Sequence, residues 1–265
     1  MHLSSIKYSE KTLDLANHFH NSHQIIYIVS GEISITVNGK SYIASSGSLV
    51  ILSLYEEHSI NILSEEYKRY TLSISSEPGY SDSDENLISA ILVNRPENFS
   101  HIIPLDENEI FEKLLKDMAY EYTWKAPMYK DVLDAKLKQF LICLYRYVPE
   151  LFSPDNSENT PLVYKIQNNL EKNYNKDISL KTLSNEYHLS RYHLSRVFKS
   201  VTGYSPIEYL ITCRLFAAKK YLCTTNLSIK EIIDLCGFSD ESNFSRMFRK
   251  RTGLTPSQFR KENKI

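Results

Sequence analysis

The chain has 265 residues, of which 42% are hydrophobic and 24% charged, and this length and composition suit two folded domains. Residues 160–265 hold 18 Lys and Arg against 9 Asp and Glu, a net charge of +9, while residues 1–159 hold 13 against 23, a net charge of −10. The basic part favours a polyanionic partner, although a solvated surface alone also explains scattered lysines. The N-terminus shows no basic-then-apolar pattern, and the longest apolar run, near residues 25–29, is too short to span a bilayer, so a cytoplasmic protein is predicted.

The cysteines exclude two classes of small stabilised domain. Cys143, Cys213, Cys223 and Cys236 stand singly, with no Cys-x-x-Cys pair among them. Neither a disulfide framework nor a zinc finger is therefore indicated. We interpret the four thiols as small buried apolar side chains in a reducing compartment.

Short runs rich in Ile, Val and Tyr fill residues 19–74 and are separated by turn signals. Asn38-Gly39, between two alternating apolar runs, indicates a two-residue hairpin. Strands of this length and spacing are typical of a β-barrel or jelly roll, which we predict over residues 1–76. The tripeptide that begins at Gly39 is not a phosphate-binding loop, because Ser34 stands where that motif needs its first glycine.

Three histidines in this region resemble the two cupin motifs in their spacing. His18-x-His20-x-x-x-Gln24 forms the first motif, and His58 stands in the second. The period of a strand places residues 18, 20 and 24 on one face and turns His23 away from it. In the cupin fold such residues meet inside the barrel, which implies a pocket lined by His18, His20, Gln24 and His58.

A metal in this pocket is one of three interpretations of the histidines. Gln24 occupies the position where metal-binding cupins usually have glutamate, and Ser53 and Tyr55 replace the proline and glycine of the second motif. A three-histidine site for zinc or iron stays open, beside small-molecule contacts and ordinary core histidines.

Two helices are predicted beyond a Ser-, Asp- and Glu-rich stretch that contains a short helix near residues 87–93. Asp106-x-x-Glu109 caps the first, and the second runs from about Met128 to Val148. Its apolar residues follow alternating spacings of four and three, as in a coiled-coil seam: Leu133, Leu137, Phe140, Leu144 and Tyr147. The seam either packs the helix onto the barrel or joins two copies of the chain.

Residues 153–159 form the predicted linker, and Thr160-Pro161 opens a helical domain that uses one pattern twice. The first copy is Ser195-Arg196-x-Phe198-Lys199-x-x-Thr202-Gly203-x-Ser205-Pro206-x-x-Tyr209, and the second is Ser245-Arg246-x-Phe248-Arg249-x-x-Thr252-Gly253-x-Thr255-Pro256-x-x-Phe259. Each copy predicts a helix, a tight turn and a second helix, at about 179–201 and 228–251. The expected N-caps are Ser179 and Ser190 in the first unit, and Ser228 and Ser239 in the second.

The second helix of each unit is expected to have one apolar and one polar face. The apolar faces hold Leu194, Val197, Phe198 and Val201, and Phe244, Met247 and Phe248. Tyr192, Ser195, Arg196 and Lys199 share the opposite face, as do Ser242, Ser245, Arg246 and Arg249, with Asn243 beside them. Gly203 and Gly253 are expected to supply left-handed C-caps, and Ser205-Pro206 and Thr255-Pro256 each to restart a helix with an N-cap followed by proline.

These residues resemble the signature of the AraC/XylS transcription regulators. The resemblance is carried by the run from Ile233 to Arg260, with Gly237-Phe238-Ser239-Asp240 in it, and by Arg214 and the small apolar residues of a linker helix at about 207–222. It implies that residues 160–265 bind double-stranded DNA. The sequence is thus interpreted as an α+β protein: a cupin-like barrel with flanking helices, then an all-α domain with two helix-turn-helix units.

The resemblance and the helix positions imply a role for each polar residue. Base contacts are expected from Tyr192, Ser195 and Arg196 in the first unit, and from Ser242, Asn243 and Arg246 in the second. Phosphate contacts are expected from Arg191, Lys199, Arg249 and Lys250. For each arginine of the base-contacting sets, a phosphate contact or an intramolecular ion pair is the alternative.

Further expectations concern residues 1–152 and the output of the protein. The resemblance implies that this domain binds a small-molecule effector in its histidine pocket, without a cofactor or catalysis, and joins two chains through the helical seam. It also implies transcriptional activation, hence contact with RNA polymerase. Two other functions stay open: a metal-binding cupin enzyme fused to a DNA-binding module, and a regulator that takes no ligand.

Overall fold

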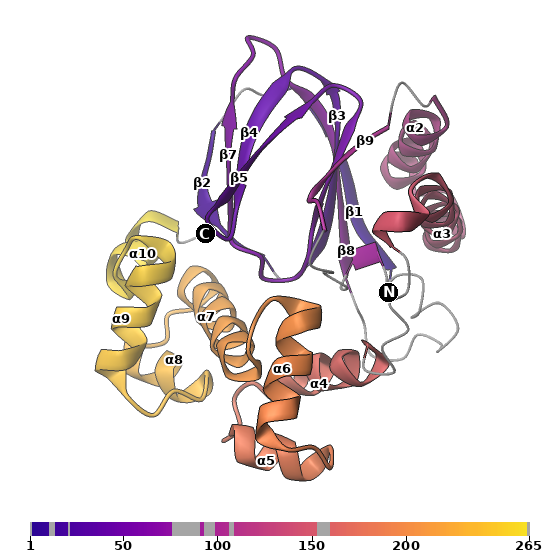
Figure 1. Cartoon of the computed structure of the whole chain (residues 1–265). Coiled ribbons are helices and arrows are strands. Elements are labelled where there is room, and N and C mark those ends of the chain that lie inside the picture. The colour runs from indigo at the N-terminus through magenta and orange to yellow at the C-terminus, as the bar shows by residue number, and fades with distance from the viewer. Residues whose placement is uncertain are drawn as a thin grey trace. The chain divides into compact units, whose positions relative to one another are not determined.

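The computed structural model describes residues 2–10, 14–20, 22–75, 91–92, 99–105, 109–152 and 160–263, and the chain forms two compact units, residues 1–157 and 158–265 (Figure 1). The first unit is rich in strands and the second is helical. The predicted two-domain α+β fold class is therefore confirmed. Among the described residues, no helix is long and apolar enough to cross a bilayer.

The N-terminal unit is built from two antiparallel sheets. Its strands are β1 His2–Ser9, β2 Leu15–His18, β3 His23–Ser30, β4 Glu32–Val37, β5 Lys40–Ser45, β6 Ser48–Leu52, β7 His58–Ile62, β8 Lys68–Ser75 and β9 Ile102–Pro104. One sheet has the order β1-β8-β3-β6-β9 and the other has the order β2-β7-β4-β5. The inner faces of both sheets meet in one core, which includes Ile26 and Ile28 of β3, Ile33 and Ile35 of β4, and Ile60 of β7.

The predicted hairpin at Asn38-Gly39 is confirmed. Val37 of β4 pairs with Lys40 of β5, which leaves two residues in the turn. Asn38 has φ 49° and Gly39 has φ 82°, and positive φ at both central residues is the requirement of the tight turn that matches the twist of a β-hairpin. Lys40 begins a strand, so it does not belong to a phosphate-binding loop.

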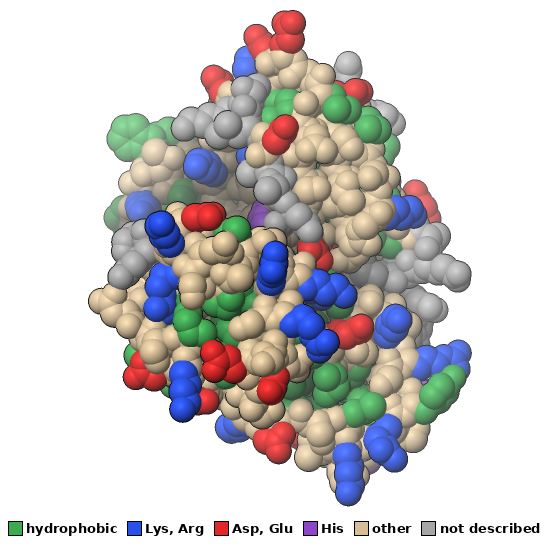
Figure 2. All heavy atoms as spheres, turned by 90° about the vertical axis from the view of Figure 1, so that its left-hand side faces the viewer, with side chains coloured by type: hydrophobic (Ala, Val, Ile, Leu, Met, Phe, Trp, Pro, Cys, Tyr) green, Lys and Arg blue, Asp and Glu red, His purple; other side chains and the backbone are tan. Residues whose placement is uncertain are grey.

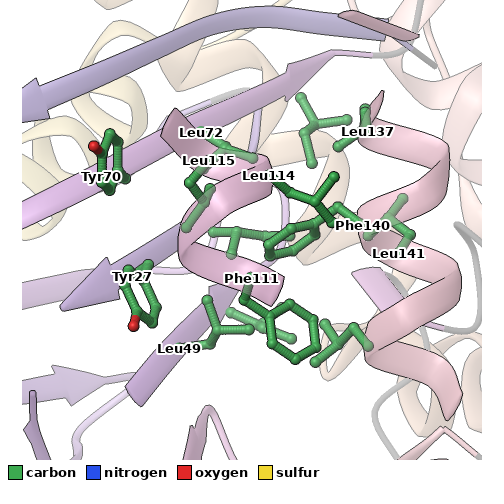
Figure 3. Packing of buried hydrophobic residues seen from close by; sticks show 14 of the residues in the cluster. Tyr27, Leu49, Tyr70, Leu72, Phe111, Leu114, Leu115, Leu137, Phe140 and Leu141 are labelled. Atoms are coloured by element: carbon green, nitrogen blue, oxygen red, sulfur yellow. The ribbon is translucent and has the colours of Figure 1, made fainter. Parts of the chain in front are cut away.

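Two long helices cover the outer face of the β1-β8-β3-β6-β9 sheet. They are α2 Glu109–Trp124 and α3 Tyr129–Tyr147, and a 3-10 turn at Pro149–Leu151 follows them. Figure 3 shows Phe111 of α2 packed between Leu49 of the sheet and Phe140 of α3, with the two phenyl ring centroids 5.4 Å apart. The predicted helix after Asp106 thus exists, although Asp106 itself lies outside the described residues.

The apolar seam of α3 faces the sheet and α2. Leu133, Leu137, Phe140 and Leu144 are all buried in the core of their own unit, and of the five predicted seam residues only Tyr147 is partly exposed, at 36%. The prediction that this seam joins two chains is wrong for the four buried residues. The alternation of four and three does not distinguish a helix that packs on a sheet from one that packs on a second copy.

Seven helices fill the described part of the C-terminal unit. They are α4 Thr160–Lys172, α5 Leu180–Glu186, α6 Arg191–Thr202, α7 Pro206–Thr224, α8 Ile229–Leu235, α9 Glu241–Thr252 and α10 Pro256–Asn263. The predicted linker, residues 153–159, lies outside the described residues, as does most of the short helix expected near residues 87–93. Of the latter, Ile91 and Leu92 are helical and buried.

Candidate nucleic-acid interface and effector site

The first helix-turn-helix unit consists of α5 and α6. The hydroxyl of Ser179 accepts from the backbone N–H of Thr182, and the hydroxyl of Ser190 accepts from the N–H of His193 at 3.1 Å. Both predicted N-caps are therefore confirmed. His188 lies in the turn with φ 54°, the left-handed conformation that reverses the chain between the two helices.

The second unit, α8 and α9, repeats this arrangement with one difference. Ser228 caps α8 as predicted, in a capping box with Glu231. The N-cap of α9 is Asp240, whose carboxylate accepts from the N–H of Asn243 at 2.5 Å, and not Ser239. Ser and Asp cap helices about equally well, so two such neighbours leave the first residue of the helix undecided at the sequence level.

The glycine C-caps and the restarts after them follow the predicted pattern in both units. Gly203 and Gly253 have φ 77° and 76°, and each ends its helix in the left-handed conformation. Ser205 caps α7, and the Thr255 hydroxyl accepts from the N–H of Gln258 at the start of α10. The helix α7, longer than its predicted range, packs against α4, α6, α8 and α10.

The two faces of α6 and α9 separate as the sequence predicts. Leu194, Val197, Phe198 and Val201 are buried in α6, as are Phe244 and Phe248 in α9, whereas Met247 is half-buried. On the opposite faces, the exposed side chains are Arg191, Tyr192, Arg196 and Lys199 of α6, and Ser242, Asn243, Arg246, Arg249 and Lys250 of α9. Ser195 and Ser245 are partly covered.

Within α9, two of the predicted base-contacting residues interact with each other. Arg246 donates from Nη2 to Oδ1 of Asn243 at 3.0 Å, one helical turn away. The sequence leaves an intramolecular partner open for each arginine, and Arg246 has one, although it is an amide and not an acid. The bond orients both side chains on the exposed face of α9. Basic side chains, drawn in blue, recur over the surface in Figure 2.

The second candidate site is a cluster of three histidines in the N-terminal unit. His18 of β2 is the register partner of His58 of β7, and their ring centroids are 4.3 Å apart. The ring of His20 lies 4.9 Å from that of His58 and 5.8 Å from that of His18. One nitrogen from each ring can be chosen so that all three lie within 4.8 Å of one another.

Gln24 does not share a strand with the two histidines of its motif, contrary to the prediction. His18 ends β2 in one sheet, whereas Gln24 belongs to β3 in the other sheet. Strand alternation still places Gln24 on the inner face with Ile26, and His23 on the outer face with Ile25. His18 and Gln24 belong to strands of different sheets, so the alternation of side chains expected within one strand does not apply across the whole motif.

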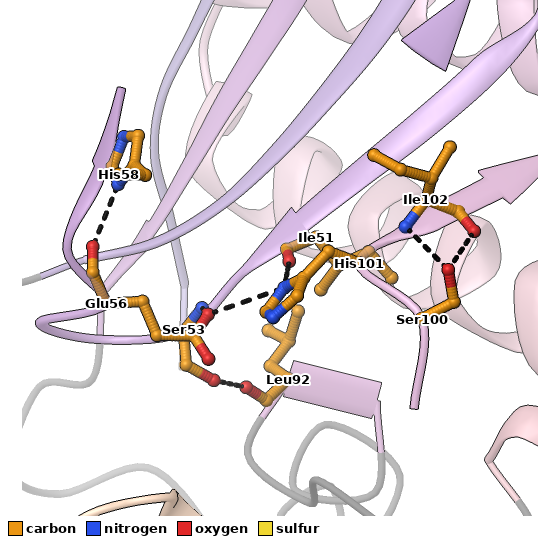
Figure 4. Close-up of polar contacts among 8 residues, drawn as sticks. All are labelled: Ile51, Ser53, Glu56, His58, Leu92, Ser100, His101 and Ile102. Atoms are coloured by element: carbon orange, nitrogen blue, oxygen red, sulfur yellow. Dashed lines mark hydrogen bonds and ion pairs between the residues drawn. The ribbon is translucent and has the colours of Figure 1, made fainter. Parts of the chain in front are cut away.

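Backbone carbonyls orient two of the three rings. Nδ1 of His58 lies 2.8 Å from the carbonyl oxygen of Glu56 (Figure 4), and Nδ1 of His20 lies 3.1 Å from that of Ser22. Because a carbonyl oxygen only accepts, both Nδ1 atoms carry the proton. Burial lowers the pKa of His58 to about 3, against the opposing effect of the bond to Glu56, and the rings of His18 and His20 lower it further. His58 is therefore neutral at physiological pH.

Sequence reasoning missed a buried polar group beside this cluster. Glu56 is 3% exposed, and its Oε2 accepts from the N–H of Ser53 at 2.6 Å and lies 3.8 Å from Nδ1 of His101 (Figure 4). His101 is also buried and donates from Nδ1 to the carbonyl of Ile51 at 2.8 Å. The Ser53 hydroxyl donates to the carbonyl of Leu92. No motif spacing links Glu56 to His101, since they come from separate segments of the chain.

Each of the two units matches a known domain family. Residues 183–262 match the family described as "Helix-turn-helix domain", and residues 8–78 match the one described as "AraC-like ligand binding domain". The chain belongs to the AraC family of transcription regulators. The match to the helix-turn-helix domain, residues 183–262, includes α6 and α9. The match to the ligand-binding domain, residues 8–78, includes all three clustered histidines.

Several AraC-family relatives match along most of the chain. The probable transcriptional regulator LumQ of Photobacterium leiognathi is 25% identical, with 98% of each chain covered. The transcriptional activator RhaS of Yersinia pestis is 21% identical over 92% of this chain and 89% of its own. AdaA of Bacillus subtilis, a bifunctional transcriptional activator and DNA repair enzyme, is 38% identical over 96 residues, which are 36% of this chain and 46% of AdaA.

The two-domain fold also occurs in a solved structure. Crystalline ToxT from Vibrio cholerae has a TM-score of 0.62 and 17% identity, with 97% of each chain covered. As an AraC-family regulator, the protein thus combines an N-terminal ligand-binding domain with a C-terminal DNA-binding domain, as the sequence predicts.

Proposed function

We propose that the protein binds specific DNA sequences through α6 and α9 and activates transcription when a small molecule occupies its N-terminal barrel. The observation that carries this proposal is the repetition of one helix-turn-helix geometry, with a capped helix and an exposed polar face in each copy. A net charge of +9 over residues 160–265 favours phosphate contacts around both helices.

The roles of the exposed side chains follow from their position on the two helices. The base-contacting set is Tyr192, Ser195 and Arg196 of α6 with Ser242, Asn243 and Arg246 of α9. A guanidinium can bond O6 and N7 of guanine, and an amide can bond N6 and N7 of adenine. The phosphate-contacting set is Arg191, Lys199, Arg249 and Lys250.

The acidic start of α9 makes the two units unequal. Asp240 and Glu241 lie at its N-terminus, where they repel phosphate, whereas α6 has no acidic residue in its first turn. The first unit should therefore contribute more of the affinity. Successive major grooves about 34 Å apart would receive the two helices.

For the N-terminal unit, we infer that the cupin-like barrel holds the effector beside His18, His20, Gln24 and His58, and that it has no enzymatic activity. Activation is proposed because RhaS and AdaA are named as activators, and it implies contact with RNA polymerase in the cytoplasm. A homodimer is also proposed. We propose that its interface contains Tyr120 and Trp124 of α2 and Met128, which precedes α3. These side chains are 65%, 69% and 70% exposed.

Selection of bound duplexes from random DNA, with the full chain at moderate salt, tests the proposed function. The expected result is an enriched motif with two conserved blocks about one helical turn apart. The same selection with Arg196→Ala should lose preference at one position of the stronger block. Failure to enrich any motif, by a protein that is folded, would refute sequence-specific binding.

A further inference from the structure

We propose that His18, His20 and His58 form a binding site for a divalent transition-metal ion of the zinc class inside the N-terminal barrel. The three side chains come from β2, from the segment after it and from β7. His18 and His58 are cross-strand partners, so the backbone pairing itself brings two imidazoles together.

The distances suit a site that closes around an ion with small side-chain rotations. One nitrogen of each ring lies within 4.8 Å of the other two. Ligand nitrogens about 2.0–2.1 Å from a zinc ion are separated from each other by about 3.3 Å in a tetrahedron. Rotation of the rings about their χ angles can bring the nitrogens from the observed to the required separation without movement of either strand.

The hydrogen bonds of two of the rings determine which of their nitrogens carries the lone pair that can bind a metal. Since Nδ1 of His58 and of His20 donate to the carbonyls of Glu56 and Ser22, Nε2 of each ring carries the lone pair. A ligand histidine whose other nitrogen donates to a backbone carbonyl is the usual arrangement in metal sites, because that bond fixes the tautomer and the orientation of the ring. Two of the three rings thus have their supporting bond in place.

Three imidazole nitrogens as donors determine the class of ion. Nitrogen donors suit zinc, nickel, copper and iron, whereas calcium and magnesium require oxygen ligands. Among the described residues, no fourth His, Cys, Asp or Glu belongs to the group. Zinc held by three protein ligands keeps at least one coordination position for water or an added ligand.

The metal site lies in the pocket that we propose for the effector. It depends on the proposed function only because that pocket is taken to be the ligand-binding part of the protein. Metal binding and DNA binding can fail separately. The DNA selection is therefore run on chelator-treated protein, and metal binding is measured without DNA.

The test uses the full chain, freed of metal with a chelator and dialysed against Zn²⁺, with Co²⁺ as a spectroscopic probe. We expect one equivalent of Zn²⁺ per chain, and visible d–d absorption of the Co²⁺ form typical of four- or five-coordinate nitrogen ligation. His18→Ala and His20→Ala should each lower the Zn²⁺ affinity on the order of 100-fold, more than the loss of a supporting residue. Thermal unfolding checks that both variants fold.

His193→Ala is the matched control, because His193 is exposed on α6 in the other unit. It should leave the stoichiometry and the affinity unchanged. Absence of saturable binding, or of the Co²⁺ absorption, in the unmodified chain overturns the proposal whatever the variants do. Equal affinity in the unmodified chain, His18→Ala and His20→Ala also overturns it, since the ion would then be bound elsewhere.

Discussion

Arg214 donates from Nε to the carbonyl oxygen of Tyr174 at 2.7 Å, across the C-terminal unit. Its Nη2 donates to the carbonyl of Lys176 at 2.8 Å, and its guanidinium lies over the ring of Phe238, 5.7 Å from the centroid. Tyr174 and Lys176 belong to the connection between α4 and α5, whereas Phe238 lies in the turn of the second helix-turn-helix unit. One side chain of α7 therefore connects the segment between α4 and α5 to the turn of the second helix-turn-helix unit.

Replacement of Arg214 by alanine is expected to lower the free energy of unfolding by roughly 2 kcal/mol, because two carbonyls lose a charged donor in a half-buried place. Arg214→Lys should recover little of the loss, since an ammonium cannot bond both carbonyls in the same plane and stack on the ring. Urea denaturation of the full chain measures both. Lys220→Ala, at an exposed position of the same helix, is the control, and an equal loss there would contradict the argument.

Gly237→Ala should destabilise the protein more than Gly253→Ala. Both glycines have φ 76°, so both substitutions incur the cost of a left-handed alanine, about 1–2 kcal/mol. Only at Gly237 does an added Cβ meet backbone, at 2.7 Å from the carbonyl oxygen of Asn175, while nothing lies within 4 Å at Gly253. The steric part should add about 1–3 kcal/mol. Thermal unfolding of the two variants side by side gives the difference, and equal shifts would exclude the close approach.

Arg196→Ala and Lys199→Ala should affect DNA binding differently. Loss of Arg196 is expected to lower affinity for the selected sequence by about 1–3 kcal/mol and to relax one base position. Loss of Lys199 should weaken binding to all sequences alike. It should also reduce the slope of log affinity against log salt concentration by about 1, the effect of one lost phosphate contact. Titrations on the selected and on random duplex, at several salt concentrations, separate the two effects. Equal losses on both duplexes for both variants would refute the division into base and phosphate contacts.

Trp124→Ser should shift the proposed dimer toward monomer. Trp124 and Tyr120 lie side by side on α2, with ring centroids 5.8 Å apart, and both are largely exposed. An aromatic pair of this kind contributes most to affinity at the centre of an interface. Sedimentation velocity at several concentrations measures the effect. Ile43→Ser removes another exposed apolar side chain, on β5, and should change nothing; a monomeric parent chain would contradict the homodimer itself.

The sequence predicts most where structure is local. N-caps depend on residues three positions apart, so Ser179, Ser190, Ser205 and Ser228 could be assigned from spacing alone. At α9 spacing alone was not sufficient, because Ser239 and Asp240 are equally good N-cap residues and only the hydrogen bond in the structure identifies Asp240 as the N-cap. The exposed polar faces of α6 and α9 were predictable for the same reason.

Long-range relationships were not predictable from spacing. The motif that starts at His18 looks continuous through Gln24, but the chain changes sheets between them. His20 and His58 nevertheless meet, as the resemblance to cupins implies, because their segments lie at the same end of two paired strands. The pairs that join distant segments, such as Glu56 with His101 and Arg214 with Tyr174, have no local signal.

Glu171 should make the stability of the protein depend on pH. The Tyr209 hydroxyl donates to Oε1 of Glu171 at 2.5 Å, between α7 and α4. Burial raises the pKa of the Glu171 carboxyl from 4.5 to about 7, although this bond and the charge of Lys172 act in the opposite direction. Since the folded state holds the proton more tightly than the unfolded state, the contribution to stability is complete below pH 4.5 and is lost as the pH rises through about 7.

The loss should reach on the order of 3 kcal/mol, the free-energy equivalent of such a shift. Glu171→Gln should be more stable than the parent chain above pH 7, because an uncharged amide still accepts from Tyr209 and places no charge in the interior. Thermal unfolding from pH 5 to pH 8 measures the two slopes. Glu262→Gln, at an exposed position of α10, should keep the slope of the parent chain. If Glu171→Gln keeps that slope as well, the carboxyl of Glu171 is ionised throughout and the burial argument is wrong.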